Sequence, residues 1–323
     1  MNICMVGHGM MGDWHTTSLK ETDCQLHTLV GRRPEPTSQF AKIHGYKHWT
    51  TDFDQAMEDP EIDIVIIAGP SETHAPMARK AIQRQKHVLV EIPIAMSSQD
   101  ARDLEREAKQ RQLCLGVVHP MRHRKEHIDL LERVNSGIER VRHVHSRIFM
   151  HRLENIGGTG YKRSWTDNLL WHHGAHLVDV GLWLTGTNST SEIQNISQHV
   201  SAPDPHTGIS MDISILIETQ KDQSILCTGS YYSKQNMHDI LVVTDRDTYF
   251  LDIKAGTFTT SAGTQPIASE QDNNAQVVKD FLNAVKTNHA PLVSGATVLP
   301  TMSLLQHVEN AQKLTQKPIQ ILD

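Results

Sequence analysis

The residues best suited to acid–base chemistry lie together on one predicted helix, residues 168–184. His172, His176 and Asp179 share a face of this helix at about 3.6 residues per turn, and Trp183 continues it. A neutral imidazole can take a proton from a hydroxyl group near neutral pH, and a carboxylate can orient it. The pattern therefore predicts a polar stripe that enters a cleft and moves a proton.

Two other interpretations of this stripe remain open. The i, i+4 spacing of His172 and His176 could hold zinc, although the glutamate of an H-E-x-x-H motif is missing. The histidines could also be satisfied structural groups in a domain interface, and His173, on the neighbouring apolar side, is expected to pack. Because the glutamate is missing, we predict no metal at this helix.

A second set of residues predicts a dinucleotide site. Gly7, Gly9 and Gly12 form the pattern G-x-G-x-x-G directly after an apolar strand and at the start of a helix. The first glycine allows a tight turn, the second lets the backbone approach a pyrophosphate, and the third permits close helix packing. The helix start, with Met10 and Met11, offers free N–H groups to the phosphates. We predict that all five residues bind the cofactor.

The end of the second predicted strand, residues 25–30, indicates which dinucleotide is bound. A site selective for NAD carries an acidic residue here, about 20 residues past the glycines, to bind the ribose 2′-hydroxyl. This chain has Arg32 and Arg33 instead. A guanidinium holds a phosphate with paired, charge-assisted hydrogen bonds. We therefore predict NADP rather than NAD, with these two arginines at the 2′-phosphate.

The order of predicted elements gives an α/β fold with two domains. Strands and helices alternate through residues 1–120, which predicts a Rossmann-type, doubly wound parallel sheet. Consecutive extended segments dominate residues 192–258, which predicts an α+β domain over residues 121–323 with an open, mainly antiparallel sheet.

Composition excludes several classes of protein. The chain of 323 residues has 31 Lys+Arg against 37 Asp+Glu, and this mildly acidic balance argues against nucleic acid as a partner. It has no apolar run of the length that spans a membrane and no secretory signal at its start. A cytoplasmic protein is expected.

The sequence resembles the glucose–fructose oxidoreductase, inositol dehydrogenase and MocA-like family over nearly its whole length. The motifs that carry the resemblance are the glycine loop with His15, the Pro-Ser-Glu-Thr-His turn at 70–74, and Glu-Ile-Pro-Ile-Ala at 91–95. The resemblance implies that four residues of these turns also border the cofactor: Pro70, His74, Glu91 and Pro93.

The chain departs from the family pattern at two positions. Ile92 stands where the family usually has a catalytic lysine, and His172 stands where an aspartate is expected four residues before the catalytic histidine. His176 and Asp179 fit the pattern. An isoleucine can neither donate nor accept a proton, so the usual family mechanism does not carry over at residue 92.

Both departures are similar to the branch typified by 4-carboxy-2-hydroxymuconate-6-semialdehyde dehydrogenase. That branch shares Glu-Ile-Pro, the Arg-Ser-Trp-Thr-Asp run at 163–167, the Leu-Leu-Trp-His-His run at 169–173 and, in part, the segment 119–122. It oxidises the cyclic hemiacetal of a ring-cleavage semialdehyde to a pyrone dicarboxylate with NADP. The resemblance implies a small dicarboxylate substrate.

The resemblance also implies roles for individual residues. His176 is expected to be the general base, Asp179 to orient or polarise it, and His172 to bind substrate or share the proton. Arginine forks bind carboxylates well. The substrate-binding residues are therefore expected to be His119, Arg122, Arg163, Trp165 and His172.

Three other functions remain as alternatives. The broader family suggests an NADP-dependent oxidoreductase for a sugar or cyclic polyol, although neutral polyols do not require paired arginines. The missing lysine leaves room for a non-catalytic NADP-binding sensor, and a hydrolase with transient redox chemistry is also conceivable. A homodimer or homotetramer is expected by analogy with the family.

Overall fold

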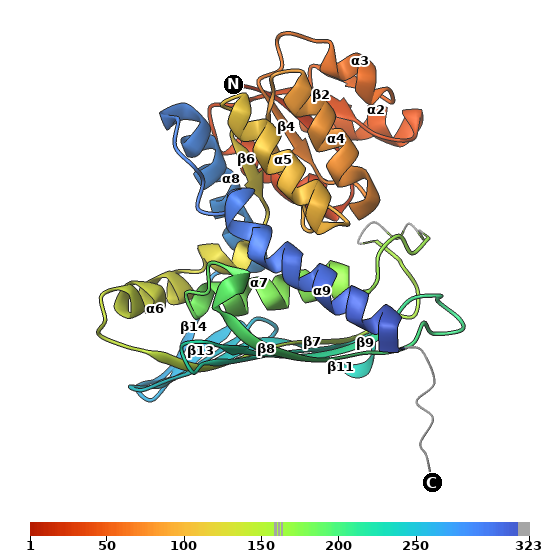
Figure 1. Cartoon of the computed structure of the whole chain (residues 1–323). Coiled ribbons are helices and arrows are strands. Elements are labelled where there is room, and N and C mark those ends of the chain that lie inside the picture. The colour runs from red at the N-terminus through yellow and green to blue at the C-terminus, as the bar shows by residue number, and fades with distance from the viewer. Residues whose placement is uncertain (158–159, 161, 163, 316–323) are drawn as a thin grey trace. The chain divides into compact units, whose positions relative to one another are not determined.

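A computed structural model describes residues 1–157, 160, 162 and 164–315 of the chain. The chain forms two compact units, which Figure 1 shows in full. Unit 1 comprises Met1–Ile128, Glu154–Thr166 and Ala268–Leu299, and unit 2 comprises Asp129–Leu153, Asp167–Ile267 and the chain from Pro300 on. The units interleave along the sequence, whereas the domains predicted at 1–120 and 121–323 do not.

Unit 1 contains a parallel sheet of six strands in the order β3-β2-β1-β4-β5-β6, which confirms the predicted Rossmann-type sheet. Its strands are β1 (Asn2–Val6), β2 (Gln25–Val30), β3 (His48–Thr50), β4 (Ile64–Ile67), β5 (His87–Val90) and β6 (Leu115–Val117). Its helices are α1 (Met10–Lys20), α2 (Pro34–His44), α3 (Phe53–Met57), α4 (Ser71–Gln83), α5 (Ser98–Gln110) and α8 (Glu270–Thr287), with the short η1 (Pro120–His123) and η4 (Ala296–Val298).

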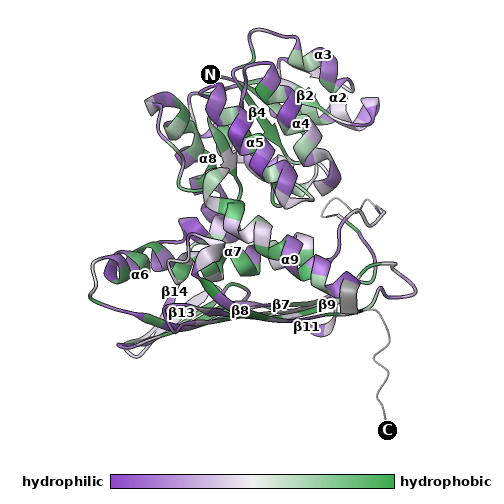
Figure 2. Ribbon diagram, viewed as in Figure 1, coloured by the Kyte–Doolittle hydropathy of each residue, from purple (hydrophilic) through white to green (hydrophobic). Residues whose placement is uncertain are grey.

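The central strands of this sheet are almost completely buried. Every residue of β4 is buried, and β1 and β5 are buried except at their first residues. Figure 2 shows these strands in green, while α5 is mostly purple. Continuous apolar strands are typical of a parallel sheet covered on both faces. The carboxyl ends of β1 and β4, where the strand order reverses, are therefore fixed in a rigid core.

Unit 2 contains a sheet of eight strands in the order β14-β13-β12-β11-β7-β10-β9-β8. Every neighbouring pair is antiparallel except β7 and β10, which run parallel, so the mainly antiparallel sheet is confirmed. The strands are β7 (Val141–His151), β8 (Ile193–Val200), β9 (Asp212–Thr219), β10 (Ser224–Ser230), β11 (Tyr232–Thr244), β12 (Thr248–Asp252), β13 (Thr257–Thr260) and β14 (Gly263–Pro266).

The helix that carries the histidines packs directly on this sheet. It consists of the π-helical η2 (Leu170–Gly174) followed by α7 (Ala175–Leu184). A Cβ at Gly181 would lie 2.4 Å from Cγ2 of Ile225 on β10, so only glycine permits this approach. The remaining helices are α6 (Lys125–Asn135), the short η3 (Thr190–Glu192) and α9 (Leu299–Thr315).

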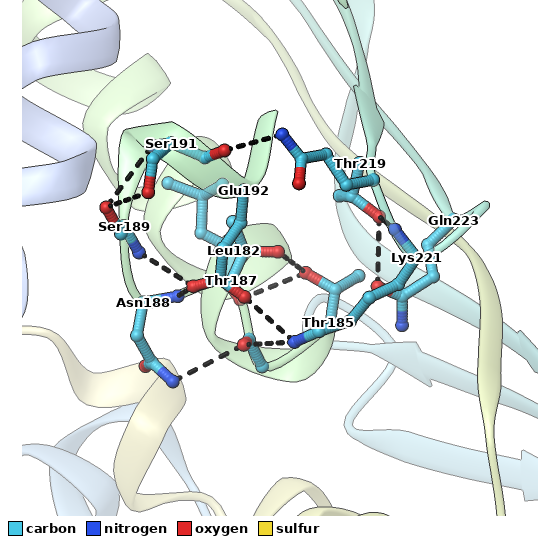
Figure 3. Close-up of polar contacts among 12 residues, drawn as sticks. Leu182, Thr185, Thr187, Asn188, Ser189, Ser191, Glu192, Thr219, Lys221 and Gln223 are labelled. Carbon is cyan, nitrogen blue, oxygen red and sulfur yellow. Dashed lines mark hydrogen bonds and ion pairs between the residues drawn. The ribbon is translucent and has the colours of Figure 1, made fainter. Parts of the chain in front are cut away.

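Polar contacts fix the carboxyl end of α7, as Figure 3 shows. The Thr185 hydroxyl donates to the carbonyl of Leu182 at 3.0 Å and lies 2.9 Å from the Thr187 hydroxyl. Ser189 and Glu192 form a capping box at η3, and Lys221 pairs with Glu192 at 2.9 Å. The end of the histidine helix is therefore tied to the turn between β9 and β10.

Among the described helices, none combines the length and apolar composition needed to cross a bilayer.

Candidate active site

The glycine loop has the geometry of a phosphate-binding turn. Gly7 has φ +95°, and a Cβ there would lie 2.5 Å from the carbonyl oxygen of Ala68. A Cβ at Gly12 would lie 2.2 Å from the carbonyl oxygen of Gly7, whereas one at Gly9 would meet nothing within 4 Å. The first and third glycines are therefore required by packing, and the second faces open space at the start of α1. This arrangement fits a bound dinucleotide.

These contacts predict that two alanine substitutions affect different properties, one the stability of the fold and the other the binding of the cofactor. Gly12→Ala is expected to lower the free energy of unfolding by about 1–3 kcal/mol, because the new methyl group overlaps the backbone. Gly9→Ala is expected to leave stability unchanged and to weaken cofactor binding roughly tenfold, about 1.4 kcal/mol. Thermal unfolding and a cofactor titration on both variants test this, and equal loss of stability in the two would contradict it.

The two arginines lie where β2 ends and α2 begins. Arg32 and Arg33 are both exposed, and Arg33 is the N-cap residue of α2. Burial lowers the pKa of His8, in the glycine loop, and the charge of Arg33 lowers it further. A Cβ at Gly31 would lie 2.8 Å from the His8 ring. The arginine segment therefore lies next to the glycine loop.

A histidine connects the turns that follow β4 and β5. The His74 ring is buried, with Nδ1 2.7 Å from the carbonyl oxygen of Pro93 and Nε2 3.0 Å from that of Gly69. Pro70 is the N-cap residue of α4. The structure therefore brings Pro70, His74 and Pro93 together at the carboxyl edge of the sheet.

A second buried histidine holds the glutamate of the Glu-Ile-Pro turn. His15 on α1 is fully buried, and its Nε2 donates to Glu91 Oε1 at 2.7 Å. The first helix and the turn after β5 are thus joined by one charge-assisted hydrogen bond. Ile92 is also buried. Its side chain brings no proton-transfer group to this turn.

Two of the predicted substrate-binding residues lie in and before η1. His119 and Arg122 are both buried, and the Arg122 guanidinium donates to the carbonyl oxygen of Thr297 at 3.1 Å. Asn273 on α8 donates to the carbonyl oxygen of Pro120. This anchoring makes η1 a rigid support for its side chains.

Trp165 is a further predicted substrate-binding residue and lies in the segment Glu154–Thr166 of unit 1. Trp165 is half-buried. Arg163 lies outside the described residues.

The histidine helix is not the uniform α-helix that the spacing predicts. Residues 170–174 form a wide π turn, so the prediction of regular α-helical geometry is wrong at this end. Trp171 is buried there, and its indole N–H donates to Glu309 on α9 at 3.2 Å. Such turns occur frequently at functional sites.

The three predicted catalytic residues sit in different surroundings. His172 and His176 are partly buried, and His172 Nδ1 lies 3.0 Å from Asp167 Oδ2. Asp179 is buried and accepts a hydrogen bond from the Thr301 hydroxyl at 3.0 Å. One partner of Asp179 is thus Thr301 on α9, a contact that no spacing pattern predicts.

The structure also reveals partners of His173, which we expected only to pack. Its Nδ1 lies 2.7 Å from the hydroxyl oxygen of the buried Tyr231, and its ring meets the His172 ring edge-on, with centroids 4.4 Å apart. Arg152 Nη1 lies 3.3 Å from the same hydroxyl. Tyr231 is 58 residues from His173 in the sequence, so no spacing pattern could have joined them.

Within the described ranges, no group of three or more His, Cys, Asp or Glu side chains is arranged to hold a metal ion.

Comparison with known proteins identifies the two halves of the chain. Residues 1–119 match the oxidoreductase family with an NAD-binding Rossmann fold, and residues 126–256 match the C-terminal domain of bacterial oxidoreductases. The 4-carboxy-2-hydroxymuconate-6-semialdehyde dehydrogenase of Sphingobium sp. (strain NBRC 103272 / SYK-6) is 31% identical over 231 residues, 71% of each chain.

Two solved structures share the whole fold. UDP-N-acetylglucosamine 3-dehydrogenase GnnA from Acidithiobacillus ferrooxidans superposes with a TM-score of 0.80 at 19% identity, covering 96% of this chain and 97% of that one. Levoglucosan dehydrogenase, in complex with NADH and levoglucosan, gives a TM-score of 0.83 at 14% identity, covering 98% and 97%. With its glycine loop, its two sheets and these relatives, the chain belongs to the Gfo/Idh/MocA family of NAD(P)-dependent oxidoreductases.

Proposed function

We propose that this enzyme oxidises the cyclic hemiacetal of a carboxylated hydroxymuconate semialdehyde to a pyrone dicarboxylate, with NADP as the oxidant. The likeness to the semialdehyde dehydrogenase over 71% of the chain carries the proposal. Two features of the chain support it: the absence of the family lysine at Ile92, and the histidines of η2 and α7.

The replacement of the lysine by Ile92 moves proton transfer to other groups. Ile92 is buried in the turn after β5, and its side chain cannot exchange a proton. The imidazoles of His172 and His176 remain partly accessible. We therefore assign proton transfer to these histidines.

The proposed reaction divides into a hydride and a proton. A bound nicotinamide would supply the acceptor for the hydride that leaves the hemiacetal carbon. A ring nitrogen of His176 takes the hydroxyl proton, so that the C–O bond becomes the carbonyl of the product. Asp179 supports the helix position of that imidazole through Thr301, and His172 binds the substrate or shares the proton.

The two carboxylates of the proposed substrate require cationic groups. Arg122 is a buried guanidinium whose orientation is set by the carbonyl of Thr297. A fixed guanidinium is well suited to bind a planar carboxylate through two parallel N–H groups. We propose Arg122 and Arg163 as the carboxylate ligands, and His119 and Trp165 as further substrate-binding residues.

An activity assay tests this function directly. The purified enzyme is mixed with NADP and the semialdehyde made by 4,5-ring cleavage of protocatechuate, and NADPH absorbance is followed. Inositol and glucose serve as controls. NADPH formation with the semialdehyde alone supports the proposal. Reduction with a polyol alone would instead favour the sugar or polyol dehydrogenase, and no reduction despite tight NADP binding would favour the sensor.

We further propose that the open face of the unit 2 sheet joins two copies of the chain. Four half-buried apolar side chains lie in one row across neighbouring strands: Leu216, Leu226, Leu241 and Phe250. His145 on β7 pairs with Leu226 on one side and with Leu241 on the other, so it lies between these two leucines in the row. A row of this kind across a sheet is better buried than hydrated.

The oligomeric state after one charge insertion tests this interface. Leu226→Lys is expected to shift the protein to a smaller species in analytical ultracentrifugation, because an ammonium group would be buried in the row. Ile43→Lys, at a residue 76% exposed on α2, is the matched control and is expected to leave the species unchanged. A sedimentation coefficient unaffected by Leu226→Lys would refute the interface.

A further inference from the structure

Two neighbouring imidazoles on the π turn are bonded to partners of opposite kind. His172 Nδ1 lies 3.0 Å from a carboxylate oxygen of Asp167, whose side chain is only 7% exposed. An ionised carboxylate can only accept hydrogen bonds. The proton of a neutral His172 is therefore held on Nδ1, which leaves Nε2 as an acceptor.

His173 faces a donor instead. The Arg152 guanidinium can only donate, so the Tyr231 oxygen accepts from Nη1 at 3.3 Å. The guanidinium also lies over the phenol ring, 5.4 Å from its centroid. The Tyr231 hydroxyl, whose oxygen lies 2.7 Å from His173 Nδ1, can then donate its proton to that nitrogen. In that arrangement the single proton of a neutral His173 is on Nε2.

The charge state of His173 agrees with this assignment. Burial lowers the pKa of His173 well below its usual range, and the nearby charges of His172 and Arg152 lower it further. Burial also raises the pKa of Tyr231, so its hydroxyl keeps its proton. Both groups are neutral near pH 7, and a neutral imidazole has one N–H donor and one acceptor nitrogen.

The Nε2 atoms of His172 and His173 both remain available to bind a ligand. Among the residues that the structure describes, neither His172 Nε2 nor His173 Nε2 has a hydrogen-bond partner, and His172 retains 33% of its side-chain exposure. Neither atom is among the buried, unsatisfied ones. A ligand can therefore meet an acceptor and a donor on adjacent residues.

We propose that His172 and His173 form an acceptor–donor pair for the substrate, set in opposite tautomers by Asp167 and by the Arg152–Tyr231 chain. His172 Nε2 accepts a hydrogen bond from a substrate hydroxyl, and His173 Nε2–H donates one to a substrate oxygen. Asp167, Tyr231 and Arg152 are positioning residues. The substrate contact rests on the proposed function, whereas the tautomers do not.

The tautomers can be measured without any substrate. Nitrogen-15 NMR of the histidine-labelled enzyme, with resonances assigned by single substitutions, is expected to show His172 protonated on Nδ1 and His173 on Nε2. Tyr231→Phe should move the proton of His173 toward a mixture of tautomers. Tyr249→Phe, which removes another buried hydroxyl of unit 2, should leave both unchanged. A proton on Nδ1 of His173 in the unaltered enzyme would overturn the proposal.

Two substitutions of His173 then test the donor role. Glutamine places an N–H group near the position of Nε2, whereas asparagine places its amide near Nδ1. With the substrate of the enzyme, His173→Gln is expected to retain most of kcat/KM, while His173→Asn loses about 10- to 100-fold, the effect of one hydrogen bond to a reacting group. Equal losses in both would contradict the donor role. If the semialdehyde is not oxidised at all, the proposed function fails while the NMR result still decides the tautomers.

Discussion

Replacing His176 by glutamine is expected to lower kcat for the semialdehyde by about 10²- to 10⁴-fold, the usual contribution of a general base. Glutamine keeps the approximate size of imidazole but cannot take a proton. The dissociation constant for NADP is expected to stay the same, because the residues proposed to hold the cofactor phosphates are those of the glycine loop and the two arginines after β2. Steady-state kinetics and a cofactor titration measure the two effects separately.

Controls separate loss of the base from loss of structure. His289→Gln removes an exposed histidine of unit 1 and is expected to leave kcat unchanged. Asp179→Asn is a less direct test of the mechanism, because Asp179 is buried and hydrogen-bonded to Thr301. The unfolding temperature of this variant must therefore first be compared with that of the unaltered enzyme. Normal turnover by His176→Gln with NADP bound would remove His176 from the mechanism and leave His172 as the remaining candidate base.

The Rossmann-type half of the fold was predictable because its signals are local. The apolar strand, the glycine pattern and the following helix occupy only a few residues at the chain start, and residues 25–30 coincide with β2. The helix expected at 73–85 begins at Ser71 instead, since Pro70 can serve as its N-cap. Boundaries moved by two residues do not alter the position of the cofactor turns.

The assignment of α8 to unit 1 was not predictable from local pattern. The periodicity predicts a helix at 275–287 but not its partner. In the structure, a Cβ at Gly116 on β6 would lie 2.5 Å from Phe281, and His123 lies 3.3 Å from Asp280. These contacts join residues more than 150 positions apart. Helix α8 therefore belongs to the same unit as the parallel sheet of strands β1–β6. A single domain boundary at residue 120 does not describe this unit.

The candidate site shows the same division between local and distant signals. Sequence spacing found His172 and His176, but it assumed one helical period through residues 170–174, where the chain forms a π turn. The partner Tyr231 lies between β10 and β11, and Arg152 directly follows β7. Their type and spacing carry no pattern, so their contribution to His173 is visible only in three dimensions.

The second large effect is expected at the cofactor end of the site. Arg33→Ala should weaken NADP binding by about 10- to 100-fold, the loss expected for a charge-assisted hydrogen bond of about 1.5–3 kcal/mol. NAD binding should change little, because NAD has no 2′-phosphate for the guanidinium to hold. Arg32→Ala is expected to act in the same direction, since both side chains are exposed at the end of β2.

The lysine substitution separates charge from shape at this position. Arg33→Lys keeps the positive charge but loses the planar fork, so its affinity for NADP is expected to lie between those of the unaltered enzyme and Arg33→Ala. Titration of each variant with both cofactors at two salt concentrations measures this, because a charge contact with phosphate weakens as salt rises. Equal affinity of the unaltered enzyme for NADP and NAD would refute the role of both arginines. In that case the segment after β2 would tolerate either ribose, and the preference for a cofactor would have to come from its concentration rather than from its binding site.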